Sequence, residues 1–381
     1  MSIDLEHLNL KRAVIEVFGG CNYTCQMCPQ GSAEGREKEF LKKMPLRQFE
    51  SILDQITPKY GYPVINLEGS GEPTMAKDLH EYIAACTKRG LKSYLYCNGA
   101  KFTGQYMKDC IDAGLSLIRF SVIGYNRELY QKWMSKDNWD LIKSNTTEAA
   151  AYVKEVNSKC SVQSYHLILD PKNAEWEAEQ YKNNFIIPTG VISYIWKMHN
   201  WSGNHSPEYI RSGKKRSCGR PSAEELTVRA GGVNGMTAAV TPCCQVLGPP
   251  SESKSVLGHL SSQTFEEIWT GNLYTELREK HNAGDFDSIS YCKGCDFLQE
   301  DTDVLCWTND PKVEQVWDFI DEAGGKDAVN AKIHGLKAVF DTGIFENIEA
   351  SWNKPSCADG KLKVCSMKCG AEFDPFSAQF K

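Results

Sequence analysis

The chain has 381 residues, of which 41% are hydrophobic and 24% charged, enough to bury a large core and to form two or three domains. Its 43 basic and 49 acidic side chains give a net charge of −6, which argues against a broad nucleic-acid surface. No apolar run approaches the roughly 18 residues of a membrane span, and the N-terminus does not resemble a signal peptide. The sequence therefore predicts a cytoplasmic protein with no membrane or nucleic-acid partner, in which clustered cysteines indicate metal binding or catalysis.

Strands and helices are predicted to alternate along the first half of the chain. The predicted strands are 12–18, 64–68, 92–97, 117–123, 161–169 and 191–196. The predicted helices are 45–55, 78–89, 105–113, helical material within 128–156, and 173–184. This alternation favours an α/β fold with a parallel sheet, and its length suits a partial (β/α)6 barrel better than a full eight-stranded one. The functional site is expected at the carboxyl ends of the strands.

Three of the 16 cysteines directly follow the first predicted strand. Cys21, Cys25 and Cys28 have the spacing C-x3-C-x2-C on a loop that begins with two glycines. Three thiolates suit a 4Fe–4S cluster with one open iron, whereas a structural zinc site needs a fourth ligand. The motif, placed after the first strand of a β/α chain, resembles the signature of the radical S-adenosylmethionine (radical SAM) superfamily. A zinc site or a chance grouping is the alternative.

Residues near the ends of later strands extend this resemblance over about residues 12–200. The segment 68–73, Glu-Gly-Ser-Gly-Glu-Pro, resembles the family's Gly-Gly-Glu-Pro motif, which contacts the methionyl amino group of S-adenosylmethionine (SAM). In the family, a hydrophobic residue before the last cysteine lies by the adenine. A serine in the fourth strand is placed to bond a ribose hydroxyl. The implied SAM-binding residues are Met27, Gly69, Ser70, Gly71, Glu72, Asn98 and Ser121. Ordinary turn and strand positions are the alternative.

The resemblance also implies the chemistry, which belongs to the cofactor. In this family, the reduced cluster cleaves SAM to methionine and a 5′-deoxyadenosyl radical, and that radical abstracts a hydrogen atom from the substrate. A flavodoxin or ferredoxin is the implied electron donor.

A second cysteine group is predicted to build an iron–sulfur domain. Its elements are a hairpin turning at Asn234-Gly235 and a helix opened by a capping box of Thr264 and Glu267. Their order resembles the SPASM/Twitch domain of many radical SAM enzymes, with His259 in place of the usual asparagine. The resemblance implies an auxiliary 4Fe–4S cluster, a zinc ribbon being the alternative. The implied ligands are Cys218, Cys243, Cys292 and Cys295.

Three further side chains are candidates for catalysis. Cys243 is preferred to Cys244 as the ligand because it follows a proline, which leaves Cys244 as a spare thiol. We hypothesise that Cys244 donates a hydrogen atom to a substrate radical, as an epimerase requires; a buried cysteine is the alternative. After the sixth strand, Lys197 and His199 are candidates for proton transfer, between tryptophans that suit a sugar face. Packing of the barrel mouth against the second domain is the alternative.

The expected division is a radical SAM core (1–205), an auxiliary-cluster domain (206–305) and a C-terminal extension (306–381). The extension holds Cys306, Cys357, Cys365 and Cys369, whose spacing departs from the full SPASM pattern. One auxiliary cluster is therefore favoured, with a second cluster or a zinc site as the alternative. The isolated cysteines are expected to be small buried hydrophobic residues. They are Cys86, Cys97, Cys110 and Cys160.

The sequence predicts a radical SAM oxidoreductase that oxidises or epimerises a carbon of a sugar, aminocyclitol or similar metabolite. Only 11 residues precede the first predicted strand, too few for the N-terminal peptide-recognition module of many peptide-modifying members, so a small-molecule substrate is favoured. One alternative is a peptide or protein maturase that crosslinks or oxidises side chains. A second alternative is a non-enzymatic iron–sulfur or zinc-binding protein.

Overall fold

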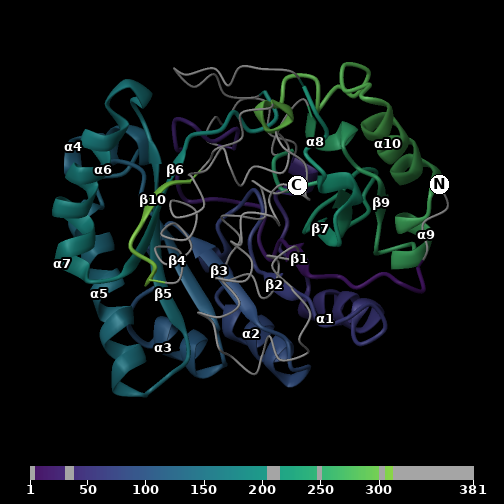
Figure 1. Ribbon diagram of the computed structural model, residues 1–381. Coiled ribbons are helices and arrows are strands. Elements are labelled where there is room, and N and C mark those ends of the chain that lie inside the picture. The colour runs from purple at the N-terminus through teal and green to yellow at the C-terminus, as the bar shows by residue number, and fades with distance from the viewer. Residues whose placement is uncertain (1–4, 31–37, 204–214, 247–250, 300–304, 312–381) are drawn as a thin grey trace, which may run out of the picture.

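One curved sheet organises the computed structural model, which describes residues 5–30, 38–203, 215–246, 251–299 and 305–311. Its ten strands lie side by side in the order β10-β6-β5-β4-β3-β2-β1-β7-β8-β9 (Figure 1). No helix in these ranges is long and apolar enough to cross a membrane.

The six predicted strands form the middle of this sheet, and consecutive strands pair in parallel. These strands are β1 (Arg12–Ile15), β2 (Val64–Asn66), β3 (Ser93–Cys97), β4 (Leu117–Ser121), β5 (Ser161–Ile168) and β6 (Ile192–Lys197). Because β1 and β6 each pair with a different outer strand, the barrel stays open. The predicted partial barrel is therefore confirmed.

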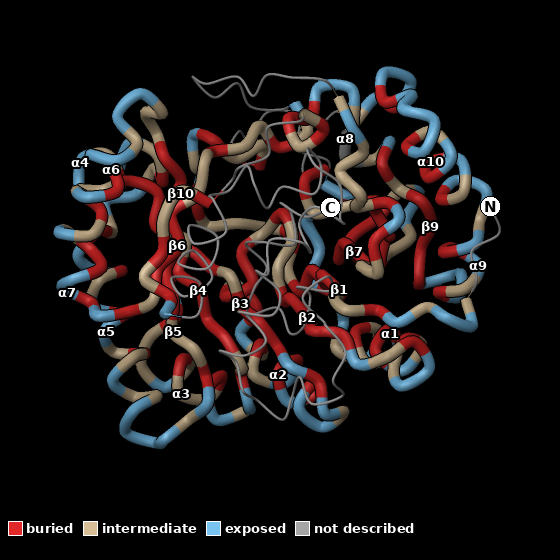
Figure 2. The backbone as a smooth tube through the Cα atoms, viewed as in Figure 1, coloured by how far each residue is buried: buried red, intermediate tan, exposed pale blue. Residues whose placement is uncertain are grey.

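Helices cover the outer face of the six parallel strands (Figure 1). They are α1 (Leu46–Ile56), α2 (Leu79–Lys88), α3 (Gly104–Asp112), α4 (Arg127–Met134), α5 (Trp139–Glu155), α6 (Ala174–Tyr181) and α7 (Ile187–Thr189). Each amphipathic helix turns its apolar side to the sheet; α1, for example, buries Phe49, Ile52, Leu53 and Ile56. The strands are accordingly buried, and the outward helix faces exposed (Figure 2).

The predicted hairpin and capped helix form a second unit on the β1 edge. Its elements are β7 (Glu225–Arg229), β8 (Ala239–Thr241), α8 (Ser251–Lys254), β9 (Gly258–His259), α9 (Phe265–Trp269) and α10 (Asn272–Ala283). Strands β7 and β8 pair antiparallel, and Asn234 and Gly235 take the positive φ angles that their turn needs. The Thr264–Glu267 capping box opens α9 as predicted.

Each edge of the open barrel pairs with a strand from later in the chain. β7 pairs in parallel with β1, and the Arg12 Nη2–Glu225 Oε1 ion pair of 2.8 Å joins them. At the other edge, β10 (Leu305–Thr308) pairs antiparallel with β6. Cys306 therefore lies in a barrel-edge strand, and Cys357, Cys365 and Cys369 lie outside the described residues. The four isolated cysteines are buried, as predicted.

Candidate active site and auxiliary-cluster site

The loop with the first three cysteines lies at the carboxyl end of β1 and is held by the end of α4. Gln26 N donates to Trp133 O over 2.8 Å, and Cys25 Sγ lies 3.8 Å from Met134 Sδ. Cys21, Cys25 and Cys28 are all partly exposed. The thiols therefore stand on a fixed loop at the end of the barrel where parallel β/α folds place their sites.

The electrostatics of these thiols fit a cationic group that they share. Burial, and then the charges of Cys28 and Cys21, raise the pKa of Cys25 well above its usual value. Three thiolates so close together need compensating positive charge, which iron supplies. In the described part of the chain, no three His, Cys, Asp or Glu side chains are grouped to hold a single metal ion. A 4Fe–4S cluster suits a wider set, because each thiolate binds a different iron atom.

The loop after β2 passes against the cysteine loop so closely that only glycine fits. A Cβ on Gly71 would lie 2.0 Å from Phe18 O, and a Cβ on Gly69 would lie 2.2 Å from Glu16 Oε2. Glu72 N also donates to Gly20 O over 2.8 Å. The two glycines of the predicted SAM motif thus allow its backbone to lie against the start of the cysteine loop. A cofactor that binds to both loops requires them to lie this close together.

Glu72 and Asn98 join the loops after β2 and β3 to the cysteine loop. Glu72 accepts from Thr74 with one carboxylate oxygen and from Asn98 N (2.8 Å) with the other. Asn98 Nδ2 in turn donates to Asn22 Oδ1 over 2.9 Å, and its own Oδ1 accepts from Ala100 N. Asn22 lies between the first two cysteines. The sequence did not single it out, because no motif indicates that it contacts Asn98. The Glu72 carboxylate bridges loops, and its contact with SAM stays a prediction.

Asn98→Ala should weaken SAM binding roughly tenfold, because it removes the hydrogen bond to Asn22 that holds the cysteine loop and the bond from Ala100 N that holds the turn after β3, at about 0.5–1.5 kcal/mol each. The measurement is equilibrium binding of SAM to the reconstituted protein. Gln105→Ala, which removes only an exposed bond to Asp109, is the matched control and should bind SAM like the parent. Equal affinities for the two variants would contradict this role of Asn98.

On the inner face of the barrel, Ser121 of β4 pairs with Tyr165 of β5. Tyr165 hydrogen-bonds Ser121, and burial raises the pKa of Tyr165 to about 12, with Glu68, Cys25 and Cys28 adding to the shift. Ser121 thus stands near the core thiols, as its predicted place in the pocket requires. Met27 is buried in the main core. Tyr165 is a further candidate for the functional site. In the sequence, only its position on the inner face of β5 could have indicated this.

Ser70 belongs to a buried polar network that joins the SAM motif to the second unit. Its N and Oγ donate to Glu16 Oε2 over 2.6 and 2.8 Å. Arg229, in β7, forms an ion pair with the same oxygen over 3.1 Å and also donates to Ser70 Oγ. Glu16 and Arg229 are 0% and 1% exposed. The Ser70 side chain therefore fixes the loop in place, and its own contact with SAM stays a prediction.

The four predicted auxiliary ligands line one small cavity between the hairpin and the end of α10. They are Cys218, Cys243, Cys292 and Cys295. Burial, and then the charges of Cys243, Cys295 and Cys218, raise the pKa of Cys292. His281, which the sequence did not single out, adds its Nε2 at 3.6 Å from Cys292 Sγ. Four thiols facing one cavity fit a fully ligated cluster.

Cys244 and the adjacent Cys243 have different surroundings. Its Sγ accepts from Arg220 Nη1 over 3.1 Å and lies 3.8 Å from Gln245 Nε2. Cys244 is absent from the cavity lining that holds Cys243. This placement supports Cys243 as the ligand. The hydrogen-donor role of Cys244 stays a prediction.

The segment after β6 packs against the auxiliary cysteines. The ring of His199 lies 3.9 Å from that of Trp201 and 5.5 Å from that of Phe297. Asn200 N donates to Asp296 Oδ2 over 3.1 Å. The contacts of His199 and Trp201 therefore support the alternative in which this segment packs the barrel mouth against the second unit. This packing brings the auxiliary cavity to the barrel mouth.

Lys197 lies on the sheet face that packs against the helices. It is paired with Ile168 and shares its face with Ile195 and His166. His166 identifies that face, because it bonds Glu177 of α6 over 2.7 Å. The predicted proton transfer by Lys197 gains no support from this position, which is turned away from Tyr165.

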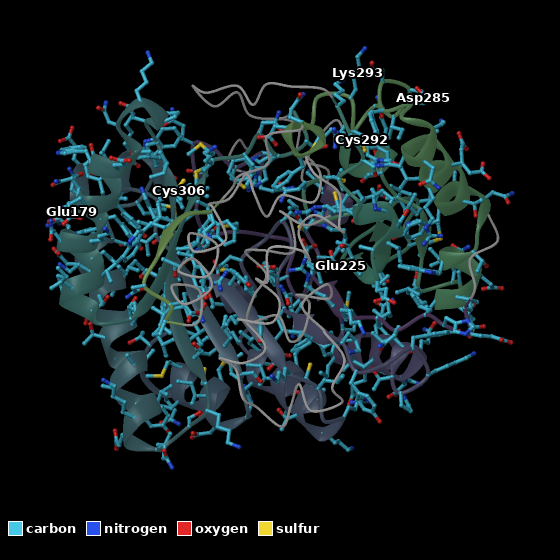
Figure 3. The ribbon with its side chains drawn as sticks, viewed as in Figure 1. Glu179, Glu225, Asp285, Cys292, Lys293 and Cys306 are labelled. Carbon is cyan, nitrogen blue, oxygen red and sulfur yellow. The ribbon has the colours of Figure 1, made fainter. Side chains whose placement is uncertain are left out.

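Cys306 is far from the auxiliary cavity. Figure 3 shows Cys306 and Cys292 on opposite sides of the molecule, on the barrel edge and beside the second unit. Cys306 is not among the residues that line the cavity. It therefore adds no ligand to the four described above.

Comparisons with known proteins agree with both parts of this arrangement. Residues 15–177 match the model of the radical SAM superfamily, and residues 232–296 match that of an iron–sulfur cluster-binding domain, SPASM. The first match covers the cysteine loop and β2 to β5, and the second covers the hairpin turn, β8 and the C-x2-C pair. The 4Fe–4S core cluster, SAM and an auxiliary iron–sulfur cluster follow from these two domains.

Two curated relatives match most of their own length. A tungsten-containing aldehyde ferredoxin oxidoreductase cofactor-modifying protein of Pyrococcus furiosus is 22% identical, over 79% of this chain and 93% of the relative. An AdoMet-dependent heme synthase of Methanosarcina barkeri is 22% identical, over 75% and 93%. Among solved structures, BtrN in complex with AdoMet and 2-DOIA superposes with a TM-score of 0.51 at 18% identity, over 75% of this chain and 92% of that one. This likeness shows a shared fold.

Proposed function

Because this chain belongs to the radical SAM superfamily and carries a C-terminal SPASM domain, we propose that it oxidises a hydroxyl-bearing carbon of a small molecule. The observation that carries the proposal is the auxiliary cavity. Its four cysteines offer a cluster a complete ligand set, and packing of 199–203 on 294–297 brings it to the barrel mouth. A fully ligated cluster cannot bind substrate, but it can take up an electron.

The bound core cluster and SAM supply the radical that abstracts a hydrogen atom. For a hydroxyl-bearing carbon, the balance is simple. The carbon would lose that hydrogen atom, the hydroxyl would lose a proton, and formation of the carbonyl would release one electron, for which a cluster held by the four cysteines of the cavity would be the acceptor. A flavodoxin or ferredoxin is the proposed source of the electron that starts the reaction.

Two ionisable side chains beside the core thiols can handle the proton. Glu68 lies two residues after β2, where Asn66 Nδ2 donates to its carboxylate over 3.0 Å, and its charge acts on Tyr165 of β5. We infer that Glu68 accepts the hydroxyl proton, because a carboxylate oxygen is a proton acceptor of the kind used in general base catalysis. Tyr165 would then hold the hydroxyl in place.

Glu68→Gln should lower product formation by about 10²–10⁴-fold, the usual contribution of a general base. Cleavage of SAM to 5′-deoxyadenosine should continue, because the glutamine leaves the cysteine loop intact. Both products are measured in one anaerobic assay by mass spectrometry. Product formed at the parent rate would rule out Glu68 as the base.

The names of the relatives support a small-molecule substrate. A cofactor-modifying protein and heme synthases act, by these names, in making or modifying small cofactors. A sugar or an aminocyclitol remains the favoured substrate, with a related hydroxyl-bearing metabolite as the wider class.

The test is turnover in D2O against two substrate panels, polyols and aminocyclitols on one side and Ser- and Cys-containing peptides on the other. Oxidation gives a product lighter by two hydrogen atoms, and EPR should detect a newly reduced auxiliary cluster. Epimerisation instead gives a product that gains one deuterium from solvent. Turnover of peptides alone would replace the proposal by a peptide maturase, and no cleavage of SAM at all would leave the non-enzymatic alternative.

A further inference from the structure

Arg220 places a positive charge at the auxiliary cavity. Its guanidinium lines the cavity with the four cysteines, and it is held by two contacts. Nη1 donates to Cys244 Sγ over 3.1 Å, and Cζ lies 4.9 Å above the ring of Phe297. The ring and the sulfur therefore fix the orientation of the charge.

No acidic side chain in the described part of the chain forms an ion pair with this guanidinium. Two other arginines, in contrast, pair with carboxylates: Arg229 with Glu16, and Arg12 with Glu225. Arg220 instead faces sulfur, because its Nη1 lies 3.1 Å from Cys244 Sγ and the residue lines the same cavity as Cys243. Its charge is thus available to the cluster rather than neutralised by a carboxylate.

We propose that Arg220 raises the reduction potential of the auxiliary cluster and so makes it an effective acceptor of the substrate's electron. Four thiolates give a cluster net negative charge, and reduction adds one more. A fixed cation nearby stabilises the reduced form more than the oxidised form, because the interaction grows with the charge on the cluster. Burial between Phe297 and the hairpin limits screening by water.

This inference deepens the proposed function, since an electron acceptor matters only for oxidation. Arg220 is a positioning residue of the electron path, and it touches no substrate. Epimerisation, in contrast, needs no net electron uptake from the substrate. A potential tuned for electron uptake therefore fits oxidation.

The experiment is an EPR-monitored redox titration of the auxiliary cluster without substrate, in a background lacking Cys21, Cys25 and Cys28 so that only this cluster responds. In Arg220→Gln, the ratio of reduced to oxidised auxiliary cluster at a fixed potential should fall at least tenfold. For a one-electron couple, this corresponds to a shift of the reduction potential by about 59 mV to more negative values. Arg220→Lys should keep most of the parent potential. Lys280→Gln, which removes an exposed charge paired with Glu276 on α10, should not move it.

Gln245→Lys tests the same idea in the opposite direction. Gln245 lines the cavity beside Cys244, so an added cation there should shift the potential to more positive values. An unchanged potential in iron-loaded Arg220→Gln would overturn the proposal. If Arg220→Gln does not load iron, an unchanged potential in Gln245→Lys would do so. Because no substrate is present, this result is independent of the turnover test of the proposed function.

Discussion

Replacing Arg229 by methionine is expected to lower the free energy of unfolding by about 3–5 kcal/mol, the usual cost of removing one partner from a buried ion pair. Glu16 is 0% exposed and would be left with only neutral hydrogen-bond donors, Ser70 and Ala230. Desolvation of that carboxylate is then uncompensated. The measurement is urea unfolding of the reconstituted protein, followed by circular dichroism.

A matched control separates burial from charge. Arg127→Met also removes an arginine that bonds carboxylates, Asp137 and Asp140, but its side chain is 59% exposed. It should leave the free energy of unfolding nearly unchanged, because water already screens the pair. Equal losses for the two variants would show that the Glu16–Arg229 pair contributes nothing beyond a surface contact.

The same network predicts a functional effect of Arg229→Met. Ser70 donates both its N and its Oγ to Glu16, so movement of Glu16 releases the SAM loop. SAM binding should weaken together with stability, although Arg229 stands in the second unit. Unchanged SAM affinity in a destabilised variant would confine Arg229 to a structural role.

Replacing Cys25 by alanine is expected to abolish the formation of 5′-deoxyadenosine. Cys25 is the central thiol of the core set, and the charges of Cys28 and Cys21 raise its pKa, as expected for three thiols that share one cluster. The core cluster should be lost while the auxiliary cluster stays. Iron should therefore fall from about eight to about four atoms per chain, if the chain holds one 4Fe–4S cluster of each kind.

Two other cysteine variants complete this experiment. Cys110→Ala changes a buried thiol on α3, outside both sites, and should keep full iron content and SAM cleavage. Cys292→Ala should lose the auxiliary iron but still produce 5′-deoxyadenosine. Deoxyadenosine from Cys25→Ala at the parent level would refute the assignment of the core site. About twelve irons in the parent would place a second auxiliary cluster among the C-terminal cysteines.

The sequence by itself determined what depends on near neighbours in the chain. The C-x3-C-x2-C motif, the Thr264–Glu267 capping box and the apolar spacing of the barrel helices each lie within one loop or one helix. Their physical causes act over a few residues, so they can be read without a fold. The parallel order of the six strands followed from the same alternation, because short right-handed connections leave few topologies open.

The tertiary structure alone decided which distant residues meet. Arg229 and Glu16 are 213 positions apart, and Asn98 and Asn22 are 76 apart. Their pairing depends on strand order and register, because a shift of one residue turns a strand's side chains to the opposite face. The same register turned Lys197 toward the helices and Tyr165 toward the core thiols. Sequence spacing shows which chemistry a chain carries, and packing at a definite register fixes which groups share a site.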